Sequence, residues 1–123
     1  MRKLFSALIF VAIMAITAAT PAYAHAHLKR AVPAVGSEVS PGPSALRLSF
    51  SEGIELPFSH IEIAMGDGMT IEPASVALDS NDPSVIVVTL RGPLDPGTYD
   101  VTWHVVSVDT HKTQGQYTFA VNP

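Results

Sequence analysis

The chain has 123 residues, of which 11 are acidic and 7 basic, giving a net charge of −4 at neutral pH, and it contains no cysteine. The acidic balance argues against binding to nucleic acids or anionic membranes, which attract clustered Lys and Arg side chains. The lack of cysteine excludes disulfides and thiolate ligands, so a metal site would have to use His, carboxylate, Met or backbone groups.

The first 24 residues have the pattern of a cleaved secretory signal. Two basic residues precede an almost continuous apolar run over 4–19, and residues 21–24 end in a small-x-small cleavage pattern. The run is short for a membrane span. We therefore expect cleavage after Ala24, export to a bacterial periplasm, and a mature domain over 25–123. Loss of the two basic residues takes the net charge from −4 to −6.

Short runs of alternating apolar and polar residues follow, separated by Gly, Pro, Asn and Asp. Leu46, Leu48 and Phe50 alternate with Arg47 and Ser49, which is typical of a strand with one buried face. The expected strands are 27–32 at a sheet edge, 45–50, 59–65, a weak 70–78 interrupted by a proline, a central 84–90, 99–105 and 116–121. No later window predicts an amphipathic helix. We predict an all-β domain of about seven strands, an antiparallel Greek-key sandwich or barrel of immunoglobulin or cupredoxin type.

Asp109 and His111 follow the long strand and lie two residues apart, so on an extended backbone they would project to the same side. A carboxylate and an imidazole form half of a metal site. Cleavage after Ala24 would expose His25, whose α-amine and ring Nδ1 can together chelate a metal ion. Three nitrogens and one oxygen suit Cu(II). We therefore predict one Cu(II) per chain on His25, Asp109 and His111.

Two other interpretations of these residues are open. Asp109 and His111 are also ordinary turn residues, because Asp commonly bonds its own backbone in turns. A free amine with His27 at the third position can wrap Cu(II) or Ni(II) using deprotonated backbone amides, without any fold. His27 is therefore an additional or competing ligand.

The remaining donor side chains are assigned positions in the fold. His60 is expected in solvent, and His104 lies on the face opposite Trp103, where it is either structural or supports a ligand. Met65 and Met69 flank a Gly-Asp-Gly turn. Two methionines near a turn are more often packing residues than ligands, so no Cu(I) site is assigned.

Five stretches that together cover nearly the whole mature domain match one known family. They are His25-Ala26-His27-Leu28, Pro33-Ala34-x-Gly36-Ser37, Leu48-Ser49-Phe50-Ser51-Glu52, Pro96-Gly97-Thr98-Tyr99 and Trp103-His104-Val105-Val106-Ser107-Val108-Asp109-x-His111. The sequence resembles the CopC-type periplasmic copper-binding proteins, especially their YobA-like branch. The resemblance implies a small β-barrel or sandwich that binds Cu(II) through an N-terminal His, an Asp and a second His, which here are His25, Asp109 and His111. It also implies an inner-membrane partner of CopD type. Some members carry a Met-rich loop for Cu(I), a region that holds only two methionines here.

Three functions are compatible with these patterns. We favour a non-catalytic Cu(II) carrier or buffer in copper homeostasis or resistance, because a full set of strong ligands favours holding an ion. An oxidative copper enzyme of the polysaccharide monooxygenase kind also uses an N-terminal His. Two features argue against such an enzyme. Asp109 would occupy an equatorial copper position that this chemistry leaves open, and Trp103 is expected to face inward, which leaves no aromatic platform for a polysaccharide. A structural sandwich with incidental histidines would take up no stoichiometric copper.

Overall fold

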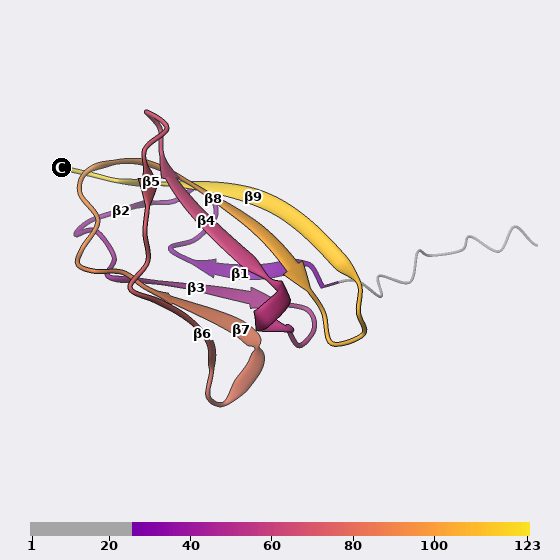
Figure 1. Ribbon diagram of the computed structural model, residues 1–123. Helices are drawn as coiled ribbons and strands as arrows, with labels where there is room; N and C mark the ends of the chain where they lie inside the picture. Colours follow the sequence, from indigo (N-terminus) through magenta and orange to yellow (C-terminus); the bar gives the residue numbers. More distant parts are fainter. Residues whose placement is uncertain (1–25) are drawn as a thin grey trace, which may run out of the picture.

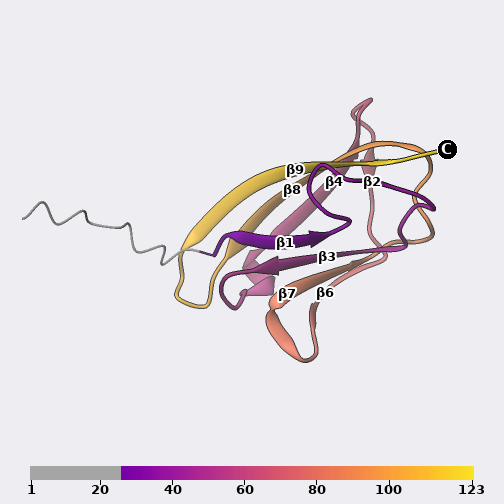
Figure 2. The same ribbon diagram turned by 180° about the vertical axis from the view of Figure 1, so that it is seen from behind.

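The structure, a computed structural model, describes residues 26–123. These residues form two β-sheets packed face to face, with residue 26 and the C-terminus at opposite ends of the sandwich (Figures 1 and 2). The signal peptide, its cleavage site and His25 fall on residues 1–25 and so lie outside the described part. Within residues 26–123, no helix is long and apolar enough to cross a membrane.

The described part consists of nine strands and one short 3-10 helix. They are β1 (Leu28–Val32), β2 (Glu38–Val39), β3 (Ala45–Phe50), η1 (Leu56–Phe58), β4 (His60–Met65), β5 (Thr70–Ile71), β6 (Ser75–Asp79), β7 (Asp82–Thr89), β8 (Gly97–Val106) and β9 (Lys112–Val121). One sheet has the order β1-β3-β7-β6 and the other β2-β9-β8-β4-β5. Every strand pair is antiparallel except β2 with β9, which is parallel.

The predicted all-β sandwich is confirmed, with β1 at a sheet edge and β7 inside a sheet as expected. The prediction of one strand over 70–78 was wrong. That stretch is two strands in different sheets, because β5 pairs with β4 whereas β6 pairs with β7. Pro73, which lacks a backbone donor, lies in the crossing between them. The two-residue β2 was not expected either, so the strand count is nine rather than seven.

The core is built from the residues that alternation predicted to face inward. Phe50 meets Trp103 edge to face with ring centroids 5.2 Å apart, and Tyr99 stacks on Phe119 at 5.4 Å. Gly115 lies under the indole, because a Cβ there would come within 2.4 Å of Trp103 Cζ2. The aromatic side chains therefore join the two sheets and hold β8 and β9 in a fixed relation.

The β8–β9 hairpin positions the candidate site. Its register pairs Val106 with Lys112, so a five-residue turn over 107–111 joins the strands. The sequence interpretation placed the start of the last strand at residue 116, but pairing resumes at Lys112. The described chain begins at the same end of the sandwich as this turn (Figures 1 and 2).

Candidate metal centre

The turn over 107–111 brings Asp109 and His111 together. The backbone amide of Ser107 donates to the His111 carbonyl at 2.9 Å, and the amide of Thr110 donates to the Ser107 carbonyl at 2.8 Å. Thr110 has a φ of +69°, in the left-handed region, which closes the turn. The two side chains meet because the turn folds back, and the expectation of an extended backbone here was wrong.

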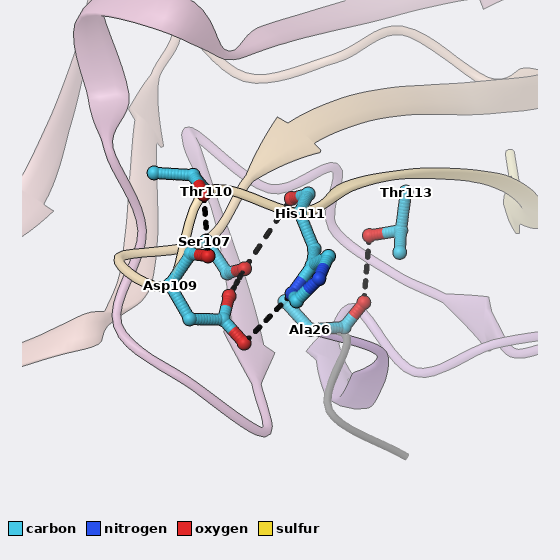
Figure 3. Close-up of polar contacts among 6 residues, drawn as sticks. All are labelled: Ala26, Ser107, Asp109, Thr110, His111 and Thr113. Carbon is cyan, nitrogen blue, oxygen red and sulfur yellow. Dashed lines mark hydrogen bonds and ion pairs between the residues drawn. The ribbon is translucent and has the colours of Figure 1, made fainter.

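Asp109 and His111 form a direct pair, drawn in Figure 3. His111 Nδ1 lies 2.9 Å from Asp109 Oδ2, and the Ser107 hydroxyl donates to Asp109 Oδ1. The Ser107 hydrogen bond, and then that of His111, lowers the pKa of Asp109 to about 2. An ionised carboxylate only accepts hydrogen bonds, so in the neutral imidazole Nδ1 carries the proton and Nε2 the lone pair. The pair remains accessible, with 45% of the His111 side chain and 35% of the Asp109 side chain exposed.

The first described residue is fixed beside this pair. Ala26 is fully buried, and its carbonyl accepts a 2.7 Å hydrogen bond from the Thr113 hydroxyl, two residues after His111 (Figure 3). The contact joins residues 87 positions apart in the sequence. It places the backbone that follows His25 next to the turn that carries the predicted ligands.

His27 is an exposed residue whose backbone is held by the fold. Its amide donates to Ser51 Oγ at 3.0 Å, and its carbonyl accepts from the Ser51 amide at 2.9 Å. Wrapping of a metal by the tail alone requires the amide of His27 to lose its proton. That loss would remove the hydrogen bond to Ser51, so the folded chain opposes this competing mode.

Glu52 is a charged residue near the turn that sequence reasoning did not single out. Its Oε2 is buried and has no hydrogen-bond partner within residues 26–123. Glu52 follows Ser51, which holds His27, and precedes Gly53, whose carbonyl accepts from the amide of Val108 at 2.9 Å. This carboxyl oxygen thus lies in the loop that connects Ser51, the partner of His27, with the turn. The only sequence signal is the Ser-Glu at the end of β3, and nothing in the spacing placed it near Val108.

The described residues bring together only part of the predicted ligand set. No group of three or more His, Asp or Glu side chains in residues 26–123 is arranged to hold a metal. Asp109 and His111 are together, whereas His25 lies outside the described part. Met65 packs against the core, as expected of a packing residue, and Met69 is exposed.

Comparison with known proteins identifies the family. Residues 28–122 match the CopC domain. The chain belongs to the CopC family. Protein YobA of Escherichia coli K12 is 43% identical over 112 residues, which cover 90% of each chain. Copper resistance protein C of E. coli is 39% identical over 106 residues, covering 81% of this chain and 83% of that protein.

A solved structure supports the same assignment. The crystal structure of PcoC, a methionine-rich copper resistance protein from E. coli, has a TM-score of 0.73 and 38% identity, and the match covers 80% of this chain and 100% of PcoC. The family resemblance read from the sequence is therefore confirmed. Asp109 and His111 lie inside the stretch that matches the CopC domain, whereas His25 precedes it.

Proposed function

We propose that the mature protein is a periplasmic Cu(II) carrier or buffer that holds one copper ion on His25, Asp109 and His111. The observation that carries this proposal is the hydrogen bond from Thr113 to the buried Ala26. His25 is covalently joined to Ala26 and therefore immediately precedes this anchored residue in the chain. The hydrogen bond supports the proposal because it holds Ala26, the residue that follows His25, beside the turn that carries Asp109 and His111.

The donor groups fit Cu(II). Cleavage after Ala24 would give His25 a free amine beside its own imidazole, and the two can close one chelate ring. His111 would offer Nε2, because its Nδ1 proton is directed at Asp109. The Asp109 carboxylate, with its pKa of about 2, is ionised at neutral pH and supplies negative charge. A site rich in nitrogen with one oxygen favours Cu(II), which also ranks highest in affinity among the divalent first-row ions.

Asp109 has two ways to contribute to such a site. It can bind the ion directly, or it can orient the His111 imidazole as carboxylates commonly do for histidines that bind metals. In the structure both of its oxygens accept hydrogen bonds, from Ser107 and from His111. Direct binding would require one oxygen to be shared with the ion. Each arrangement keeps a negative charge next to the copper.

The names of the relatives support copper as the cargo. Two of them are a copper resistance protein C and a methionine-rich copper resistance protein. The exposed pair at the end of the sandwich leaves the ion accessible for transfer. We propose an inner-membrane transporter of CopD type as the exchange partner.

A carrier has more support than an oxidative enzyme. Trp103 lies in the core with 7% of its surface exposed, so it cannot act as a platform for a polysaccharide. Phe58 is the single exposed aromatic residue in the part that the structure describes. A flat stacking surface of several rings is therefore missing from residues 26–123.

Replacement of one histidine at a time tests the proposal. Cu(II) titration of the cleaved protein should show one strong equivalent, which His111→Ala weakens sharply. The matched variant His27→Ala should retain that affinity, because His27 lies outside the proposed ligand set. The opposite result, with affinity kept in His111→Ala and lost in His27→Ala, would establish the tail-only site instead. No stoichiometric uptake by the cleaved wild-type protein would establish a structural sandwich.

A further inference from the structure

Two histidines outside the candidate centre face each other on the outer surface of the five-stranded sheet. His60 of β4 and His104 of β8 are directly opposite in the antiparallel register, and both are exposed. Their chain neighbours Ile61 and Trp103 point into the core, so the two imidazoles leave the sheet on its solvent side. Figure 1 shows β4 and β8 running side by side over their length.

The register places these histidines where two imidazoles can reach one ion. Directly opposed residues of an antiparallel pair have Cβ atoms about 4.5–5.5 Å apart and share one face. A metal ion lies about 2.0–2.1 Å from each imidazole nitrogen that binds it, so the two nitrogens must be close together. Side chains of directly opposed residues can bring them that close. No hinge or loop has to move, because both residues belong to paired strands.

The backbone around the pair is fixed on one side by Ser59. Its hydroxyl donates to the Glu55 carbonyl at 2.9 Å and accepts from the amide of Val106 at 3.0 Å. This side chain therefore connects the residue before His60 with the end of β8. Preorganised ligands lose little freedom on binding, which favours a chelate over two independent histidines.

The other side chains on this surface leave the remaining coordination positions to water. Glu62 is the next outward residue on β4, and Gln114 lies opposite His104 on β9. No third His, Asp or Glu in residues 26–123 completes a metal-binding group here. A bound ion would keep water ligands and exchange readily.

We propose that His60 and His104 form a second, weaker Cu(II) site, independent of the N-terminal chelate. Imidazole is a preferred ligand of Cu(II), and two of them in adjacent positions supply half of a tetragonal plane. This site needs no cleavage of the signal and no free amine. The site fills after the N-terminal chelate as the copper concentration rises, so that the carrier can bind a second equivalent of Cu(II).

The sequence makes a clean test possible because the chain has only five histidines. A mature chain carrying His25→Ala, His27→Ala and His111→Ala retains His60 and His104 alone. We expect it to bind one Cu(II), with an electron paramagnetic resonance spectrum showing two equatorial imidazole nitrogens. Adding His104→Ala or His60→Ala should leave one nitrogen and weaken binding by about 100-fold.

The matched control is Gln114→Ala, which alters the neighbour of His104 on the same surface and should change neither affinity nor spectrum. Since all three positions are exposed, the apo variants should melt like the triple variant. Copper uptake unaffected by His60→Ala and His104→Ala, or no uptake by the triple variant, would overturn the proposal. Equal weakening by Gln114→Ala would do the same. Failure of the N-terminal site appears separately, as loss of the strong equivalent from the wild-type mature chain.

Discussion

Thr113 offers the sharpest test of how the fold prepares the copper site. Its hydroxyl donates to the carbonyl of the buried Ala26 at 2.7 Å, and we propose that this bond holds the chain start beside His111. Thr113→Val keeps the shape of the side chain and removes the donor. The variant therefore separates anchoring of the chain start from packing of β9.

The size of the effect follows from the burial of Ala26. A buried carbonyl that loses its partner costs about 1–3 kcal/mol, so the free energy of unfolding should fall by that amount. The two hydrogen bonds between the His27 backbone and Ser51, one to the Ser51 hydroxyl and one from its amide, remain and keep the strand attached, which favours the lower end of this range. About 1.4 kcal/mol of lost preorganisation corresponds to roughly tenfold weaker Cu(II) binding.

The assay is a competition titration of Cu(II) against a chelator of known affinity, with urea unfolding of the apo protein measured in parallel. Thr118→Val is the matched control, because Thr118 also lies on β9 but donates to Asp100 Oδ1 at 2.8 Å, away from the turn. We expect Thr113→Val to weaken copper binding and Thr118→Val to leave it unchanged. Copper affinity within twofold of wild type in a destabilised Thr113→Val protein would refute the anchoring argument.

Three further predictions concern the turn and the strand behind it. Asp109→Asn keeps the shape of the side chain but removes its charge, and should weaken Cu(II) binding by about 10–100-fold; an unchanged affinity would remove Asp109 from the site. The pKa of Asp109, about 2, lies below its ordinary value of 3.8, so the contribution of the carboxylate to stability is present above about pH 4 and lost as pH falls through 2. Loss of copper affinity between pH 7 and about pH 5.5 must therefore come from protons that compete for the nitrogen ligands, because imidazoles ordinarily titrate near 6.5 and an α-amine near 8, and a pH-independent affinity in that window would argue against these nitrogen ligands. Gly115→Ala places a methyl group 2.4 Å from the Trp103 ring and should destabilise the fold by about 1–3 kcal/mol, whereas a wild-type melting temperature would show that the indole moves freely.

Much of the fold was predictable because alternation records which face of a strand is buried. The inward face of β3, formed by Leu46, Leu48 and Phe50, and the inward Trp103 of β8 were identified from pattern alone, and the structure confirms them. The division of 70–78 between two sheets could not be predicted from the sequence. Its two strands, Thr70–Ile71 and Ser75–Asp79, differ in their pairing partners and not in their own sequence patterns. Two-residue strands such as β2 carry too few positions to show any alternation.

The candidate centre was predictable only where its residues are close in the sequence. Asp109 and His111 were found as a near neighbour pair, although a left-handed Thr110 and not an extended strand brings them together. The opposition of His60 and His104 depends on the register of two strands 44 positions apart, which no local pattern specifies. For the same reason the buried Oε2 of Glu52, which has no hydrogen-bond partner within residues 26–123, could be recognised only once the loop was placed beside the turn.

The most direct test of the copper assignment compares the mature chain beginning at His25 with a free α-amine and with an acetylated one. Acetylation removes the amine and leaves every side chain in place. We predict that Cu(II) titration will show one strong equivalent for the free amine and its loss on acetylation, with the fold unchanged by circular dichroism. Equal strong binding by both forms would contradict the account, because the ion would then be held without the chain terminus.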